Sequence, residues 1–199
     1  MRLARLAEFC CVVILAAAAA TAQQFDLAFG AGTVSAPSST AFNGDFSHSP
    51  QTIGGGVYPV FSGDLLLKKN FGVQGEIAWR ASRNLYLGFQ PYRPIFFDFN
   101  GMYAPRLGRF VQPELLAGIG VEDVRFYQNT IVCSFTSCTN FISSKHFMGH
   151  FGAGLRLYAH GNFFIRPEAH LYLVRNNVEF TSPRATRYGL SIGYTFGGR

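Results

Sequence analysis

The sequence predicts an all-β protein: an eight-stranded, antiparallel, up-and-down β-barrel that spans a membrane. Three observations lead to this prediction. After the first 22 residues, the chain divides into eight segments in which apolar and polar side chains alternate. The connections between these segments are alternately long and short. No later stretch reaches the roughly 18 consecutive apolar residues that a membrane-spanning helix would need.

The clearest segment is the last one, residues 184–196, in which the alternation is unbroken. Successive side chains of a strand project to opposite faces, so this strand has one apolar face and one small or polar face. The apolar face comprises Tyr188, Leu190, Ile192, Tyr194 and Phe196. The opposite face comprises Arg187, Gly189, Ser191, Gly193 and Thr195. Such a strand must bury its apolar face in a protein core or in lipid.

The N-terminal segment has the form of a signal peptide. Arg2 and Arg5 precede an apolar run over residues 11–20, and Ala20 and Ala22 complete an A-x-A cleavage pattern. The run is too short to cross a membrane as a helix. We therefore expect residues 1–22 to be a signal peptide and residues 23–199 to form one outer-membrane β-barrel domain.

Composition and charge indicate which class of protein this is and which partners are excluded. Hydrophobic residues make up 48% of the chain and charged residues only 14%, an apolar balance for a soluble domain. The formal net charge is +6, but the only adjacent basic pair is Lys68 and Lys69. Because a nucleic-acid interface requires clustered Lys and Arg, we expect no nucleic-acid partner.

The first four alternating segments are residues 25–33, 56–67, 71–80 and 95–103. Each places charged residues opposite its apolar face, in chain order Asp26, Asp64, Glu76 with Arg80, and Asp98. The second segment alternates least clearly. Residues 35–52 and 81–93 are expected to be long loops, and residues 68–70 a short turn.

The remaining segments before the closing strand are residues 112–126, 145–159 and 163–174. Their polar faces carry Glu114 and Glu122, then His146, His150 and Arg156, then Arg166, Glu168 and His170; the closing strand adds Arg187. Residues 129–144 and 176–183 are expected to be long loops. Short periplasmic turns and long external loops are typical of outer-membrane barrels, and an even strand count places both termini in the periplasm.

Alternation alone does not distinguish a membrane barrel from a soluble barrel with its apolar face inside. The composition of the polar face favours the membrane barrel, because acids and arginines in near balance suit an enclosed lumen where buried charges must be paired. This face is also rich in glycine, and small residues leave room in a narrow interior. Aromatic residues near the segment ends suit interfacial girdles. These are Phe25, Phe71, Trp79, Tyr103, Phe147, Phe163 and Phe196.

Three prolines conflict with regular pairing, because proline cannot donate a hydrogen bond to the ladder. Pro59, Pro113 and Pro167 each lie inside a predicted strand. We expect bulges or strand ends at these positions.

The closing strand ending in Tyr194, Thr195 and Phe196, the eight-segment pattern and the signal peptide together resemble the small outer-membrane β-barrel family. That family includes the barrel domain of OmpA-type proteins. The resemblance implies a location in the bacterial outer membrane, contact with its lipid, and recognition of the C-terminal strand by the barrel assembly machinery.

Two cysteines remain after the signal peptide, and both lie in the polar stretch of residues 129–144. An exported protein meets an oxidising compartment, so Cys133 and Cys138 are predicted to form a disulfide. Metal binding by this pair is the alternative, but no histidine lies nearby in the sequence.

The best candidate for a chemical site comprises His146, His150, Glu168 and His170. Such a set can bind zinc or activate a serine, but these side chains also fit the ion-pair network of the lumen. Ser143 and Ser144 fall in a predicted loop. We therefore predict no catalytic residue, metal or cofactor, and no enzyme activity.

A structural or surface-interaction barrel, whose loops contact an extracellular partner and whose lumen is largely closed, is the favoured function. A narrow ion channel and a lipid-modifying enzyme are the alternatives.

Overall fold

The computed structural model describes residues 24–37, 52–68, 70–86, 88–133, 138–176, 180 and 183–197. The predicted signal peptide lies outside these residues. Nine strands are present in the described part of the chain. They are β1 (Gln24–Ser35), β2 (Tyr58–Lys68), β3 (Phe71–Trp79), β4 (Asn84–Tyr86), β5 (Gln90–Tyr103), β6 (Val111–Cys133), β7 (Cys138–His160), β8 (Phe163–Val174) and β9 (Arg184–Phe196). Among the described residues, no helix has the length and apolarity needed to cross a membrane.

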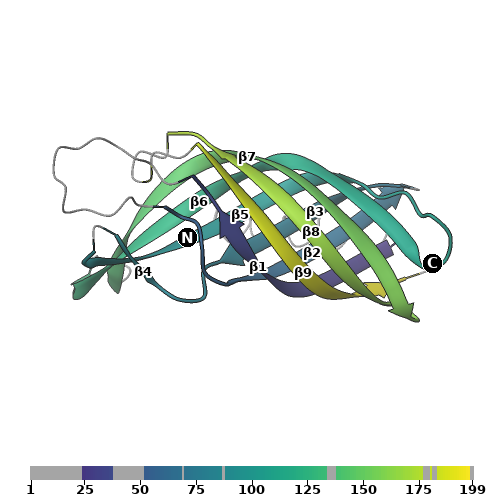
Figure 1. Cartoon of the computed structure of the whole chain (residues 1–199), viewed down its shortest axis with the longest axis horizontal. Coiled ribbons are helices and arrows are strands. Elements are labelled where there is room, and N and C mark those ends of the chain that lie inside the picture. Colours follow the sequence, from purple (N-terminus) through teal and green to yellow (C-terminus); the bar gives the residue numbers. More distant parts are fainter. Residues whose placement is uncertain are drawn as a thin grey trace, which may run out of the picture.

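The strands form one antiparallel sheet that returns on itself (Figure 1). Sequence neighbours pair from β5 to β9, β9 pairs with β1, and β1, β2 and β3 follow in order. The ring is completed by pairing of β3 with β5, which runs from Phe71↔Tyr103 to Trp79↔Ile95. Eight strands therefore follow one another around a barrel, while the short strand β4 pairs with β5 outside this ring.

The two ends of the barrel differ in their connections. One end carries the short turns between β2 and β3, β5 and β6, and β7 and β8, together with the start of β1 and the end of β9. Phe25 pairs there with Phe196. The other end carries β4 and the hairpin tip between β6 and β7, and lies away from the C-terminus in Figure 1.

The long-loop end departs from the sequence prediction. β6 and β7 each have 23 residues, so most of the predicted loop at residues 129–144 is in fact an extended hairpin. The predicted loop at residues 81–93 contains β4 and the start of β5. The apolar alternation that revealed the other strands is weak there, because polar and charged residues such as Arg93 and Arg125 replace the apolar residues of the outer face, while Tyr92 is buried on the inner face.

The predicted disulfide lies at the tip of this hairpin. Cys133 ends β6, Cys138 begins β7, and the two residues are bonded and paired in register. Four intervening residues close a small loop, for which chain-entropy arguments give a gain of about 2 kcal/mol. The bond therefore fixes the hairpin tip more than it stabilises the barrel.

The prolines interrupt the ladders less than expected. Pro59 and Pro113 lie near strand starts, at the second residue of β2 and the third of β6. The bulge expected as an alternative at Pro167 is absent: it pairs with Leu190 in mid-strand, and the β7–β8 register is the same on both sides of it. The register shifts in the described ladders fall elsewhere, between Leu66 and Lys68, Tyr127 and Val132, and Tyr158 and His160.

Burial assigns the two faces of the wall. Phe29, Ile119 and Leu190 face outward and are 59%, 59% and 55% exposed. The charged residues that alternate with such positions are buried inside. An apolar outer surface of this extent is rare on soluble proteins, and lipid is the solvent that suits it. At the short-turn end, aromatic pairs such as Phe163 and Tyr194, with ring centroids 4.9 Å apart, mark the girdle.

Candidate functional site: the charged lumen

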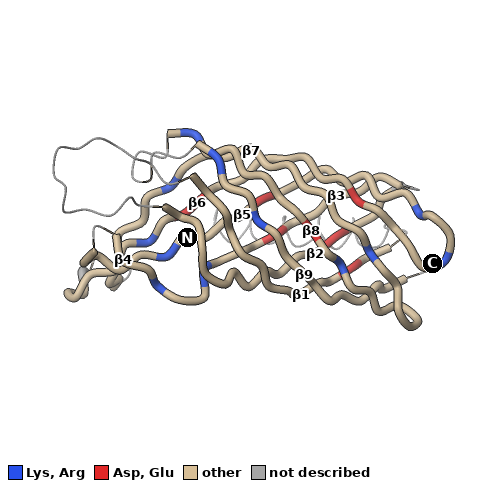
Figure 2. The backbone as a smooth tube through the Cα atoms, viewed as in Figure 1, with Lys and Arg blue, Asp and Glu red and all other residues tan. Residues whose placement is uncertain are grey.

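The charged residues that the sequence places on the polar strand faces all lie inside the barrel. All fourteen are buried: Asp26, Asp64, Glu76, Arg80, Asp98, Glu114, Glu122, His146, His150, Arg156, Arg166, Glu168, His170 and Arg187. Figure 2 shows acidic residues along the middle of the barrel, with basic residues among them. Hydrogen bonds and ion pairs join eleven of these residues into a network, which we call the lumen network. Arg80, Glu122 and His146 lie nearer the long-loop end.

Arg156 on β7 organises the half of the lumen network that lies toward the short turns. Its guanidinium donates to Asp26 on β1, to Asp64 on β2 at 2.8 Å and to Glu114 on β6 at 2.7 Å. The side chains of Arg156 and its three acidic partners have no exposed surface. One cation therefore connects three acids across the interior, which links opposite parts of the wall.

Arg166 and Arg187 extend the network toward the middle of the barrel. Arg166 donates to Asp64 at 3.1 Å and to Glu168 at 2.8 Å. Glu168 also accepts from Arg187 at 3.0 Å, and Arg187 pairs with Glu76 on β3. Glu168 is thus the link between the two halves of the lumen network.

Two histidines complete the network. His150 and His170 lie on neighbouring strands, with ring nitrogens 2.9 Å apart and rings stacked at 5.0 Å. His150 Nδ1 is 2.6 Å from Asn100 Oδ1 and 3.4 Å from Asp98 Oδ1. Asn100 was not among the predicted site residues, although it lies two residues from Asp98 and therefore on the same face.

An aromatic layer covers the network on the side of the long loops. Phe96 stacks on Tyr172 with ring centroids 4.7 Å apart, and Tyr172 stacks on His150 at 5.0 Å. Tyr92 packs against Phe180 at 5.0 Å. All of these rings, including that of His150 in the network, are fully buried. The aromatic layer and the lumen network are therefore continuous through Tyr172.

The candidate chemical set of the sequence analysis is divided by the structure. His150, His170 and Glu168 come together, whereas His146 lies apart and contacts Ser144 Oγ at 3.1 Å. Ser144 is in β7 and not in a loop, so the predicted loop position is wrong. Its side chain shares the inward face with His146, because the two residues are two positions apart in one strand.

One triad in the network has metal-ligand geometry. Ligand atoms of Glu76, Glu168 and His170 lie within 4.8 Å of one another. Arg187 contacts both carboxylates, however, and supplies the positive charge that a cation would bring. This arrangement fits a structural ion-pair network better than a metal centre.

The interior at this level is filled by side chains. Arg156, Arg166 and Arg187 have large side chains, and none of the three has any surface accessible to water. Eight strands enclose a space just wide enough for side chains to fill. The geometry therefore provides a packed and charged core where a wider barrel would have a channel.

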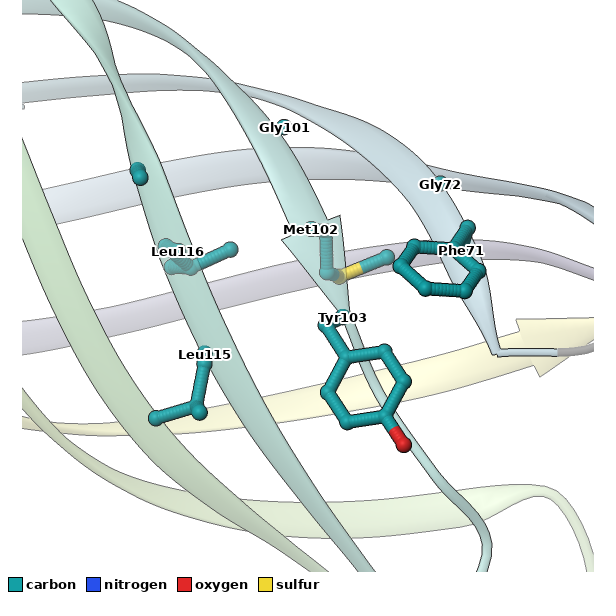
Figure 3. A pocket seen from close by; sticks show the side chains of 8 residues that line it. Phe71, Gly72, Gly101, Met102, Tyr103, Leu115 and Leu116 are labelled. Carbon is teal, nitrogen blue, oxygen red and sulfur yellow. The ribbon is translucent and has the colours of Figure 1, made fainter.

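The outer wall also has a hollow, which lies between β3, β5 and β6 near the short turns (Figure 3). Gly101 and Ala117 leave space there beside Tyr103, Phe71 and Leu115. The Phe71 and Tyr103 rings lie 5.0 Å apart. The lining holds no acid, base or nucleophile other than the Tyr103 hydroxyl, so the hollow offers apolar contact and no chemistry.

The chain matches a known protein family over nearly its whole length. The model of the outer membrane protein beta-barrel domain matches residues 9–196. No curated protein matches the chain significantly.

Solved structures match at low identity. The N-terminal β-barrel domain of Pseudomonas aeruginosa OprF is 14% identical, with a TM-score of 0.55 over 88% of this chain and 98% of that one. Ail, the attachment invasion locus protein of Yersinia pestis, is 15% identical, with a TM-score of 0.55 over 87% and 98%. Neisserial surface protein A is 9% identical, with a TM-score of 0.59 over 87% and 97%. These likenesses show the fold. Since the family model covers nearly the whole chain, the protein belongs to the outer membrane protein beta-barrel domain family and is a protein of the bacterial outer membrane.

Proposed function

We propose that the protein is a closed outer-membrane scaffold that presents its β6–β7 hairpin to a partner outside the cell. The length of this hairpin carries the proposal. A transmembrane strand needs about 9–11 residues, whereas β6 and β7 have 23 residues each. About half of each strand therefore projects beyond the membrane, and the disulfide fixes its tip. The lumen network cross-links the strands of the barrel, which gives the projecting hairpin a rigid base.

A surface role is also supported by one of the structural neighbours. Ail is described as an attachment invasion locus protein and was solved in complex with a heparin analogue, sucrose octasulfate. That ligand is Ail's. For the present chain we propose only that the projecting end contacts an extracellular partner, and that nucleic acid is not among its partners.

The proposal includes an orientation and an assembly route. Residues 1–22 direct export and are removed, and both ends of the barrel domain lie in the periplasm, beside the short turns. The assembly machinery recognises β9 through its terminal aromatic residue, Phe196, and lipid surrounds the apolar wall.

Cysteine labelling of intact cells tests this orientation. Ser82 is exposed at the long-loop end and Arg109 is exposed in a short turn. We expect Ser82→Cys to react with a membrane-impermeant maleimide on intact cells, and Arg109→Cys to react only after the outer membrane is permeabilised. The reverse pattern would contradict the orientation, and with it the surface role.

We also propose that the protein is not an enzyme. The Ser144–His146 contact is the observation that would favour the lipid-modifying alternative, because a serine needs a neighbouring base to act as a nucleophile. Both side chains share the inward face of β7, away from the lipid that such an enzyme would modify. We expect no covalent labelling of the protein by a fluorophosphonate probe. Labelling that disappears in Ser144→Ala would instead establish a reactive serine.

A further inference from the structure

A group of cations lies on the outer wall at the long-loop end, just beyond the apolar band. Phe97, Val121 and Phe147 are paired neighbours on β5, β6 and β7, and all three face outward and are exposed. Two residues further along, Asp123 pairs with Lys145; two further again, Arg93 pairs with Arg125. Two residues advance a strand by about 6.6 Å. The cations therefore lie at the level where the hydrocarbon ends and lipid headgroups begin.

The pairing of Arg93 with Arg125 is unusual. Like charges directly opposite each other on adjacent strands destabilise a sheet. Arg125 contacts Asp123 at 3.1 Å, but Asp123 also accepts a hydrogen bond from Ser143. Arg93 donates from Nη2 to the Ala81 carbonyl at 3.0 Å. Arg93 Nε is buried without a hydrogen-bond partner among the described residues.

Aromatic rings hold these cations in place. Arg83, from the loop before β4, lies with Cζ 3.7 Å from the centre of the Tyr127 ring. Arg125 lies 4.9 Å from the centre of the Phe141 ring. A guanidinium that stacks on a ring keeps its edge free to donate. The outer-wall cation cluster, defined as Arg83, Arg93, Arg125 and Lys145, thus has four positive charges and one neighbouring acid, Asp123.

We propose that the outer-wall cation cluster binds the phosphate groups of an anionic lipid in the outer leaflet. Three features point to lipid phosphate. The cluster faces the bilayer and not the lumen, it lies at headgroup level, and its paired arginines have guanidinium nitrogens, besides those that contact Asp123 and the Ala81 carbonyl, that can donate to phosphate oxygens. The apolar residues immediately below, Phe97 and Phe147, would contact the acyl chains of the same lipid. This inference rests on the proposed orientation, which places this end in the outer leaflet.

The test is a lipid titration of the full-length protein, exported and purified in a neutral detergent, monitored by native mass spectrometry. Lipid A is the probe, and chemically dephosphorylated lipid A is the matched ligand control. The variant is Arg93→Gln/Arg125→Gln. The control variant, Arg106→Gln/Arg109→Gln, removes the same charge at the other end of the barrel.

We expect the Arg93→Gln/Arg125→Gln variant to bind lipid A about tenfold more weakly for each arginine removed, since a charge-assisted hydrogen bond contributes that much or more. The control variant should match the wild type. Arg93→Lys/Arg125→Lys, which keeps the charge but loses the planar edge, should lie between them. Heat-modifiable gel migration verifies that each variant is folded.

Unchanged affinity in the folded Arg93→Gln/Arg125→Gln variant would overturn the proposal. So would equal binding of dephosphorylated lipid A, or equally tight binding of inorganic phosphate, which would assign the cluster to a soluble anion. The titration in detergent does not depend on orientation in the cell. A negative result in the titration would therefore count against lipid binding alone, whereas the Ser82→Cys labelling tests the proposed orientation separately.

Discussion

Arg156→Ala is expected to destabilise the barrel by about 3–5 kcal/mol, because removing one partner of a buried ion pair leaves the other charges uncompensated. Arg156 contacts three acids, Asp26, Asp64 and Glu114, and none of the four side chains is exposed. The lumen network has six acids and only three arginines, so no spare cation is present in it to replace Arg156. The measurement is the free energy of unfolding in urea, with the protein folded in lipid vesicles.

Two variants sharpen this test. Arg109→Ala changes an exposed arginine in a turn, and its unfolding free energy should stay within about 0.5 kcal/mol of the wild type. Adding Glu114→Gln to Arg156→Ala should recover part of the loss, because one of the three uncompensated carboxylates becomes neutral. Equal unfolding midpoints for Arg156→Ala and Arg109→Ala would show that the network carries no stability.

The second large effect is expected on the outer face, at Leu190→Arg. Leu190 is 55% exposed on β9, between Tyr188 and Ile192, about midway between the two ends of the strand. An arginine facing lipid near the bilayer midplane costs about 2–4 kcal/mol. The unfolding free energy in lipid vesicles should fall by that amount, and assembly in cells should fall with it.

Thr130→Arg is the matched control for the lipid face. Thr130 is an exposed residue of the projecting part of β6, where the same new charge meets water. Its unfolding free energy should be close to that of the wild type. Equal losses for the two variants would mean that the outer wall does not face hydrocarbon, and a soluble barrel would then have to be considered.

The faces of the strands could be predicted from the sequence, because a period of two records directly which side chains share a side. Asp26, Arg156 and Leu190 were each assigned to the correct face in this way. The partners within the lumen could not be predicted. Arg156 reaches Asp26 and Asp64 from 130 and 92 residues away, and which side chains meet depends on strand tilt and stagger. Neither the tilt nor the stagger can be deduced from the sequence of a single strand.

The projecting hairpin was missed for a different physical reason. Alternation arises where one face meets lipid and the other the lumen, and beyond the membrane neither constraint applies. Residues 129–133 and 138–144 therefore mix polar and apolar residues without regular alternation, although they lie in strands. The Ser144–His146 contact was missed with it, because Ser144 was assigned to a loop. Strand β4, with three residues, is too short to show any period.

We predict that the lumen network, which fills the interior of the barrel, closes it to ions. Single-channel recording of the folded wild-type protein in a planar bilayer measures this closure, with a wide porin as the positive control. Since Arg156, Arg166 and Arg187 are entirely buried within the interior, we predict no large, steady current. Large, steady single-channel currents from the wild type would show that ions pass the lumen network and that it does not close the barrel.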